Sequence, residues 1–254
     1  MSMTARTALV TGGSRRIGKA IVEDLAAHGF AVAIHCNSSR DDADSLAAGL
    51  TRSGARVAVV QADLTDAAET EALVAKTVAR LGPLGLLVNN ASIFAEDTVE
   101  TFDPEVSARH FAIHVTAPVL LTKRFAAALP PGSEGLVVNI VDQRVWRLTP
   151  RYFSYTLSKS ALWTATRTMA QALAPAIRVN AIGPGPTLAN ERQDVSDFEA
   201  QVDGVILKRG PELSEFGAAV RYLWEARSVT GQMIALDGGQ HLAWQTPDVT
   251  GIKE

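Results

Sequence analysis

The sequence predicts an α/β fold: a single doubly wound parallel sheet with helices on both faces. Two observations predict this class. Short, almost continuously apolar segments alternate with longer amphipathic segments along the 254 residues, as expected when helices cover both faces of a parallel sheet. A glycine-rich turn, TGGSRRIG, directly follows the first apolar segment. Together they predict a Rossmann-type domain.

The predicted strands are short and apolar, and they recur at the spacing of βαβ units. In chain order they cover Thr7–Val10, Ala31–His35, Val57–Val60, Leu86–Val88, Leu136–Ile140, Arg178–Ile182 and Met233–Leu236.

The segments between the strands show helical spacing. Ile17, Ile21 and Leu25 lie on one face of the first predicted helix, and Gly29 suits its C-terminal end. Later segments repeat this amphipathic pattern. The sequence therefore predicts a helix between successive strands, as a parallel sheet requires.

One domain is expected to span residues 1–254, because the alternation is continuous and no linker interrupts it. The pattern breaks only at residues 183–211, which begin with two Gly-Pro steps and lack clear periodicity. A long irregular segment in a compact domain is typical of a functional loop. We therefore expect a substrate-binding lid there, the alternative being an ordinary surface excursion.

Composition narrows the setting of the protein. Hydrophobic residues make up 47% of the chain, which favours a folded core. The net charge is −3, which gives no reason to expect nucleic acid or a membrane surface as partner. A single cysteine, Cys36, cannot form an internal disulfide, as is typical of a reducing compartment. We expect a cytoplasmic protein without a membrane segment and with a small-molecule substrate.

The turn after the first strand indicates a pyrophosphate site. Glycines let the backbone approach a phosphate closely, and the free N–H groups at the start of the following helix attract its charge. The predicted contacts in this turn are Gly12, Ser14, Arg15, Arg16, Ile17 and Gly18.

The end of the second strand decides between the two nicotinamide cofactors. NAD-binding sheets usually place an acid there for the ribose 2′-hydroxyl, but this strand ends in His35, Asn37, Ser38 and Ser39. Hydroxyl groups and a cation would instead accept a 2′-phosphate, so the sequence predicts NADPH. Arg15 could supply the cation, or be an ordinary solvated residue.

Two further strand ends extend the predicted cofactor site. After the third strand, Asp63 could accept from the adenine amino group while Leu64 packs on its ring; alternatively, Asp63 is only the N-cap of the next helix. After the fourth strand, Asn90, Ala91 and Ser92 would lie close to the nicotinamide ribose.

The strongest chemical signal is the stretch YTLSK, in which Tyr155 and Lys159 share one face of a helix. An ammonium beside a phenol stabilises the phenolate and is expected to lower its pKa from about 10. Such a tyrosine can act as a general acid next to a nicotinamide.

Taken together, TGGSRRIG, NNAS, the Tyr155/Lys159 pair and the PGP step after the sixth strand resemble the short-chain dehydrogenase/reductase family over essentially the whole chain. The resemblance implies Tyr155 and Lys159 as catalytic residues that also contact the cofactor, with Lys159 on the nicotinamide ribose. It further implies cofactor contacts at Pro184 and Gly185, and a homotetramer.

The sequence departs from the usual family pattern at three positions. Asp142 stands thirteen residues before Tyr155, where a typical member has its catalytic serine. His114 replaces an asparagine in a helix, and Arg16 replaces the middle glycine of the turn.

These departures, with NNASIF, resemble the pteridine reductases and the bacterial dihydromonapterin and dihydrofolate reductases. That resemblance implies a pterin pocket lined by Arg16, Ser92 and Phe94. His114 is interpreted as a hydrogen-bonded helix residue, with a proton relay as the alternative.

The chemistry is consistent with this subgroup. A flat, electron-poor pterin would stack on Phe94, the alternative for that ring being ordinary core. Reduction of a C=N bond needs hydride on carbon and a proton on nitrogen. Tyr155 can deliver the proton, and Asp142, unless it is only a strand-end cap, can recharge it. Tyr155 and Asp142 thus join the predicted substrate contacts, and no metal is expected.

We therefore predict an NADPH-dependent reductase of pterin-like substrates. One alternative is a carbonyl or 3-oxoacyl reductase on the same scaffold, against which the missing serine counts. The other is a non-catalytic NADPH-binding sensor, against which the intact Tyr155/Lys159 pair counts.

Overall fold

The computed structural model describes residues 5–189 and 194–251. Within them the chain forms a seven-stranded parallel sheet in the order β3-β2-β1-β4-β5-β6-β7. The strands are β1 (Thr7–Val10), β2 (Ala31–Cys36), β3 (Val57–Gln61), β4 (Leu86–Asn89), β5 (Gly135–Ile140), β6 (Ile177–Pro184) and β7 (Met233–Leu236). Each predicted strand is confirmed, with ends that move by at most two residues.

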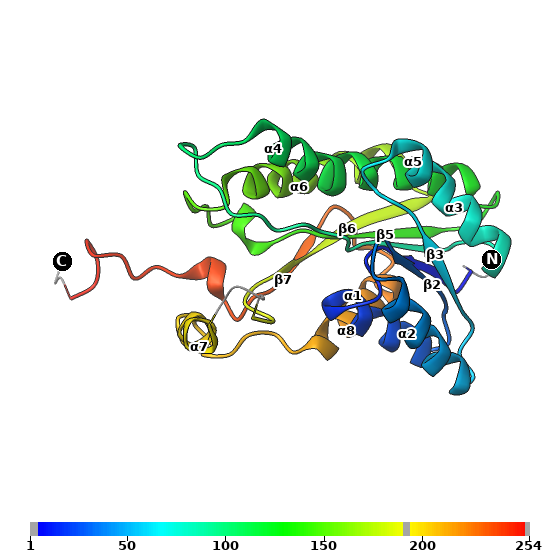
Figure 1. The fold of residues 1–254 in the computed structure, drawn as a ribbon, viewed down its shortest axis with the longest axis horizontal. Helices are drawn as coiled ribbons and strands as arrows, with labels where there is room; N and C mark the ends of the chain where they lie inside the picture. Colours follow the sequence, from blue (N-terminus) through cyan, green and yellow to red (C-terminus); the bar gives the residue numbers. More distant parts are fainter. Residues whose placement is uncertain (1–4, 190–193, 252–254) are drawn as a thin grey trace.

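Helices cover both faces of this sheet (Figure 1). They are α1 (Arg16–Ala27), α2 (Arg40–Arg52), α3 (Ala67–Leu81), α4 (Pro104–Phe111), α5 (Ala117–Ala128), α6 (Phe153–Leu173), α7 (Val195–Asp203) and α8 (Leu213–Glu225). Helices α1, α2 and α8 lie on one face, and α3 to α6 lie on the other. Short turns of other helix types complete the list: η1 (Ala112–Thr116), η2 (Gln143–Val145) and η3 (Gln240–Leu242).

Two hydrophobic clusters, one on each side of the sheet, form most of the core. Strand residues alternate between them because successive side chains point to opposite faces: Ala8 and Val10 of β1 lie in the first cluster, and Leu9 lies in the second. Phe216 of α8 fills the first cluster, and Phe125 of α5 fills the second, both fully buried. This two-sided burial explains why the strands read as continuous apolar runs.

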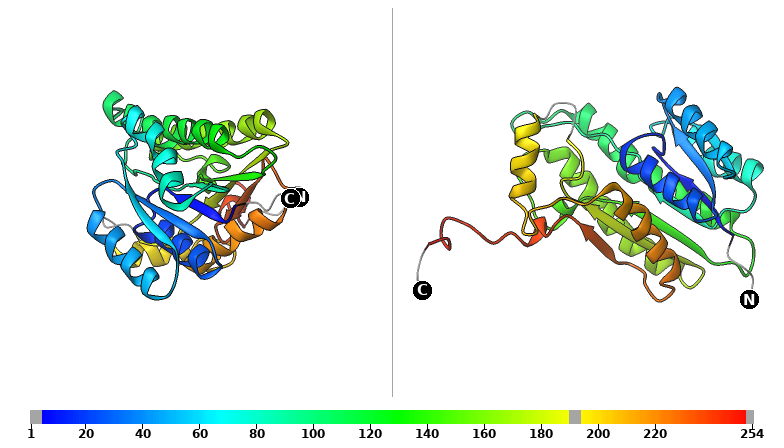
Figure 2. Two further views of the ribbon diagram at one scale, coloured as in Figure 1. Left: turned by 90° about the vertical axis from the view of Figure 1, so that its right-hand side faces the viewer. Right: turned by 90° about the horizontal axis from the view of Figure 1, so that it is seen from below.

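The segment predicted to be irregular contains a helix. β6 extends to Pro184 and α7 occupies Val195–Asp203, while residues 190–193 of the predicted lid lie outside the described residues. None of the α7 side chains is buried, so no apolar stripe marks it in the sequence. Figure 2 shows α7 at one end of the molecule, on the side from which the C-terminal stretch extends.

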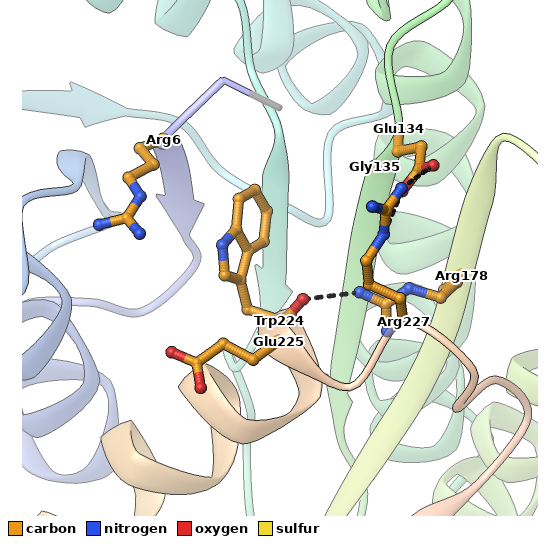
Figure 3. Close-up of a pocket in the computed structure, with 7 residues that line it drawn as sticks. All are labelled: Arg6, Glu134, Gly135, Arg178, Trp224, Glu225 and Arg227. Carbon is orange, nitrogen blue, oxygen red and sulfur yellow. Dashed lines mark hydrogen bonds and ion pairs between the residues drawn. The ribbon is translucent and has the colours of Figure 1, made fainter. Parts of the chain in front are cut away.

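A charged hollow lies at the opposite end of the strands, among Arg6, Glu134, Gly135, Arg178, Trp224, Glu225 and Arg227 (Figure 3). Here Arg178 donates to the carbonyl oxygens of Leu223, Ala226, Val229 and Trp224. It therefore satisfies the exposed end of α8, where backbone carbonyls lack helical partners. No helix of the described chain is long and apolar enough to cross a membrane.

Candidate active site

The carboxyl ends of the strands carry the candidate site, and the glycine turn after β1 is its first component. Gly12 adopts a positive φ of 60°, and the side-chain amide of Asn90 donates to its carbonyl oxygen at 3.1 Å. A Cβ on Gly18 would lie 2.1 Å from that same oxygen. Only glycine at position 18 lets the start of α1 pack this closely on the turn.

His35 supports the turn from behind. Its ring is 2% exposed; Nδ1 accepts from the Gly12 amide at 3.1 Å, and Nε2 lies 3.1 Å from the Ala62 carbonyl oxygen. The sequence predicts that His35 contacts the cofactor. In the structure its side chain holds the turn instead, because it points into the interior.

Protonation of His35 should cost stability. Burial lowers the pKa of His35 from 6.5 to about 4, so between these values the unfolded chain binds a proton that the folded chain does not. The stability that this neutral ring provides is present above pH 6.5 and is lost as the pH falls towards 4. We expect the free energy of unfolding to fall by about 2 kcal/mol from pH 7 to pH 5. Urea denaturation at both pH values measures it, and His35→Asn should lose most of this difference.

The end of β2 meets the turn through two hydroxyl groups. Ser14 Oγ lies 2.7 Å from Ser39 Oγ, and Arg15 pairs with Asp42 in the first turn of α2. Asn37 and Ser38 are exposed beside them. Hydroxyls and a guanidinium therefore converge where β2 ends.

The contacts at the end of β3 exclude one of the two roles suggested for Asp63. Asp63 Oδ1 accepts from the backbone and hydroxyl of Thr65, and these bonds lower the pKa of the Asp63 carboxyl. The N-cap of α3 is Asp66, so the alternative role suggested for Asp63 is wrong. Leu64 is 7% exposed and belongs to the core, which leaves little of its side chain for an adenine ring.

Tyr155, Asp142 and Lys159 meet at the ends of β5 and α6. Tyr155 Oη donates to Asp142 Oδ2 at 2.9 Å. Lys159 Nζ donates to the Ile140 carbonyl oxygen at 2.9 Å and lies 5.7 Å from the Tyr155 ring centroid. Asp142 Oδ1 accepts from the Arg144 amide, so this carboxylate caps η2 and binds the tyrosine at once.

Burial dominates the proton affinities of this trio. It raises the pKa of Asp142 above its usual value, and it raises the pKa of Tyr155 well above 10, with Asp142 adding to the effect. Burial also lowers the pKa of Lys159 to about 8. The expectation of a Tyr155 pKa below 10 is wrong in this structure, because desolvation and the Asp142 carboxylate outweigh the lowering by the Arg144 charge. Tyr155 therefore keeps its proton at neutral pH.

A buried aspartate that no sequence motif indicates fixes the start of α6. Asp97, 5% exposed, accepts from the backbone of Ser154 at 3.0 Å and from its hydroxyl, and its carbonyl oxygen accepts from the Phe153 amide. These contacts satisfy first-turn N–H groups of α6. They set where Tyr155 enters the site. No local motif reveals this contact, since Asp97 and Ser154 are 57 residues apart.

Phe94 presents an aromatic ring beside the tyrosine. It is 40% exposed, stacks on Tyr152 at 4.3 Å between centroids, and meets Tyr155 edge-on at 4.7 Å. The Arg144 guanidinium lies 5.3 Å from the Phe94 centroid and 4.7 Å from that of Tyr152. Neither Arg144 nor Tyr152 was foreseen. The alternative that Phe94 is ordinary core is not supported by its exposure.

Arg16 links the turn to the segment after β6. It donates to the carbonyl oxygens of Ala189 and Leu188 at 3.1 and 3.2 Å, and it adopts a φ of 51°, unusual for a residue other than glycine. Gly185 lies nearby on the chain, where its amide continues the β6–β7 pairing beyond Pro184. Arg16 thus joins the turn after β1 to the segment 183–211 predicted as the lid.

A parallel sheet in this strand order, with a glycine turn and a Tyr–Lys pair at the same edge, defines the class of Rossmann-type oxidoreductases. Within that class the chain belongs to the short-chain dehydrogenase family, whose model matches residues 6–200.

Three similar proteins illustrate the range of the family. The crystal structure of FolM alternative dihydrofolate reductase 1 from Brucella suis, in complex with NADP, is 61% identical with a TM-score of 0.95, covering 98% of this chain and 100% of that one. The dihydromonapterin reductase of Citrobacter koseri is 31% identical over 92% of this chain and 96% of its own. A 3-oxoacyl-[acyl-carrier-protein] reductase of Synechocystis is 29% identical over 94% of this chain and 98% of its own.

Proposed function

We propose that this protein is an NADPH-dependent reductase that takes a dihydropterin, such as dihydromonapterin, or dihydrofolate to its tetrahydro form. The observation that carries the proposal is the Tyr155–Asp142 hydrogen bond of 2.9 Å beside the exposed ring of Phe94. A proton donor hydrogen-bonded to a carboxyl group, beside an exposed ring on which a flat heterocycle can stack, is what this reduction would need. The similarity to dihydrofolate and dihydromonapterin reductases supports the same reaction.

The residues at the turn fit NADPH. The pyrophosphate would lie on Gly12 and the first N–H groups of α1, while the 2′-phosphate would meet Ser39, Ser14 and Arg15. Asp42 holds the Arg15 guanidinium at this place. Lys159 would bind the nicotinamide ribose, and when bound the cofactor supplies the hydride.

The substrate ring would lie against Phe94. Offset stacking on an aromatic face suits an electron-poor bicycle, and Ser92, exposed next to it, supplies a polar contact. Arg16 approaches from the turn, and its bonds to Leu188 and Ala189 support a substrate-binding role for the segment 183–211.

Proton delivery follows from the hydrogen-bond directions. Tyr155 donates to Asp142, so when its proton turns towards a substrate nitrogen, the hydrogen bond between the two residues persists only if Asp142 donates in exchange. Burial raises the pKa of Asp142, which favours the protonated carboxyl that this exchange needs. Hydride on carbon and this proton on nitrogen together convert C=N to CH–NH.

Following NADPH oxidation separates this function from its alternatives. Dihydromonapterin, dihydrobiopterin and dihydrofolate are compared with a 3-oxoacyl thioester, a substrate suggested by the relative from Synechocystis. Turnover of at least one pterin or folate is expected. Turnover of the thioester alone would favour a 3-oxoacyl reductase, and tight NADPH binding without any turnover would favour a sensor.

Replacing Arg16 with glycine should separate substrate binding from stability. Glycine removes strain of roughly 1–2 kcal/mol at a positive φ, which stabilises the folded chain. It also gives the unfolded chain more conformational freedom, which offsets that gain by about 0.4–1 kcal/mol. The melting temperature should therefore change little. Losing the guanidinium should raise KM for the dihydropterin by about ten-fold or more, the worth of one charged hydrogen bond. Steady-state kinetics and thermal unfolding measure the two effects; Arg16→Lys, which keeps the charge, should recover part of the KM.

Assembly and location complete the proposal. Apolar side chains on or near α4 to α6 are exposed, namely Phe102, Phe111, Val119 and Leu157. Burial of these side chains between copies of the chain supports a homotetramer. Sedimentation velocity tests it.

Cys36 is buried and unpaired, as suits a cytoplasmic protein.

A further inference from the structure

Ser92 lies between the open site and a buried histidine. Its side chain is exposed at the end of β4, and its Oγ has two partners in the described chain: His114 Nε2 at 2.9 Å and the Ile93 carbonyl oxygen at 3.3 Å. A serine has one hydrogen to donate and lone pairs to accept with. What Ser92 can offer a ligand therefore depends on where this hydrogen points.

The hydrogen bonds at both ends of the His114 ring fix its tautomer. At one end, the Ile93 amide approaches Nε2 at 3.3 Å; an amide can only donate, so Nε2 is an unprotonated acceptor. At the other end, Nδ1 lies 2.8 Å from Ser158 Oγ. The hydroxyl of Ser158 donates its single hydrogen to the Tyr155 carbonyl oxygen at 2.7 Å. Nδ1 must therefore carry the proton and donate it to Ser158.

The neutral state of His114 is consistent with its surroundings. The ring is 1% exposed, and burial, followed by the Lys159 and His110 charges, lowers its pKa well below the usual value. A second ring proton would remove the acceptor that both the Ile93 amide and Ser92 use.

Ser92 is left with one orientation of its hydroxyl. Both of its partners, the Ile93 oxygen and the unprotonated Nε2, can only accept. The hydroxyl hydrogen is therefore donated to one of them and points away from the open site. The lone pairs of Oγ then face the open site. Towards a ligand, Ser92 is a hydrogen-bond acceptor and not a donor.

We propose that His114, held by Ser158, is a positioning residue for substrate specificity: it fixes Ser92 as an acceptor, so the preferred substrate presents an N–H group at Ser92. The inference rests on the proposed function and names the part of the pterin that this position selects. A ring with an N-methyl group or a lone pair there is disfavoured. An asparagine at position 114 would offer both an amide donor and a carbonyl acceptor, and would leave the direction open.

Substrates in which one N–H site is blocked by methylation test the Ser92 contact. The kcat/KM of a 7,8-dihydropterin is compared with those of its 2-dimethylamino, N3-methyl and N8-methyl derivatives. In the native protein, kcat/KM for at least one derivative should be about 10- to 100-fold lower than for the parent dihydropterin. Ser92→Ala should remove most of this difference, because it lowers kcat/KM for the parent but not for that derivative. Equal losses by Ser92→Ala on all four substrates would overturn the proposal.

Two variants in neighbouring turns test the role of His114. His114→Asn should reduce the preference to within about three-fold, since the hydroxyl of Ser92 is then free to turn. His110→Asn is the matched control: it removes an equally buried histidine that stacks on His114 at 5.5 Å but contacts the Ala95 amide instead of Ser92. It should leave the preference unchanged even if kcat falls. Equal loss in both variants would reduce His114 to a packing role.

The tautomer can be read without any turnover. In protein labelled with ¹⁵N-histidine, the signals that disappear in His114→Asn should show a protonated Nδ1 and an unprotonated Nε2 at neutral pH. A protonated Nε2 would overturn the inference. If no dihydropterin is reduced, the proposed function fails, whereas the tautomer still decides the role assigned to His114.

Discussion

Tyr155→Phe is expected to lower kcat for dihydropterin reduction by about 10²- to 10⁴-fold, the usual contribution of a positioned general acid. The variant keeps the ring that meets Phe94 edge-on and loses only the hydroxyl that donates to Asp142. Burial raises the Tyr155 pKa, so the hydroxyl holds its proton until the substrate nitrogen takes it. Stopped-flow measurement of NADPH oxidation at saturating substrate isolates this step.

Cofactor binding provides the control for this variant. The NADPH dissociation constant, measured by fluorescence titration, should stay within about three-fold, because Lys159 and the glycine turn are untouched. A Tyr155→Phe protein whose kcat stays close to that of the native chain would remove the tyrosine from proton transfer. Equal losses in cofactor binding and kcat would instead indicate a collapsed site.

Asp142→Asn is expected to lower kcat by about a hundred-fold. The amide matches the carboxylate in size, and its oxygen can still accept from the Arg144 amide, but its NH2 group then faces Tyr155 as a donor and has no proton to transfer. Because burial raises the pKa of Asp142 and the reaction needs the protonated carboxyl, native activity should fall as the pH rises through that pKa. This limb of the pH profile should disappear in Asp142→Asn.

Asp142→Ser provides the matched comparison, since serine polarises a carbonyl but does not supply a proton from a carboxyl. It should lose dihydropterin activity as Asp142→Asn does, while retaining or gaining activity on a carbonyl substrate. If either variant keeps native kcat and the native pH profile, Asp142 acts only as the cap of η2.

Much of the fold could be predicted because its signals are local. Strands buried on both faces read as apolar runs, and all seven were located. The glycine turn, Tyr155 and Lys159 also follow from spacing within a few residues. Helix α7 escaped prediction because none of its side chains is buried, which leaves no periodic pattern to detect.

The sequence by itself determined the sheet, the edge at which ligands are expected to bind, and the types of residue that gather there, since parallel strands bring their carboxyl ends to one side. Only the tertiary structure decided which of these residues touch. Asp97 reaches Ser154 across 57 positions, and His114 joins Ser92 to Ser158, 22 and 44 positions away. The tertiary structure also reversed the expected direction of the Tyr155 pKa shift. Hydrogen-bond direction and desolvation depend on neighbours in space, and no spacing along the chain specifies them.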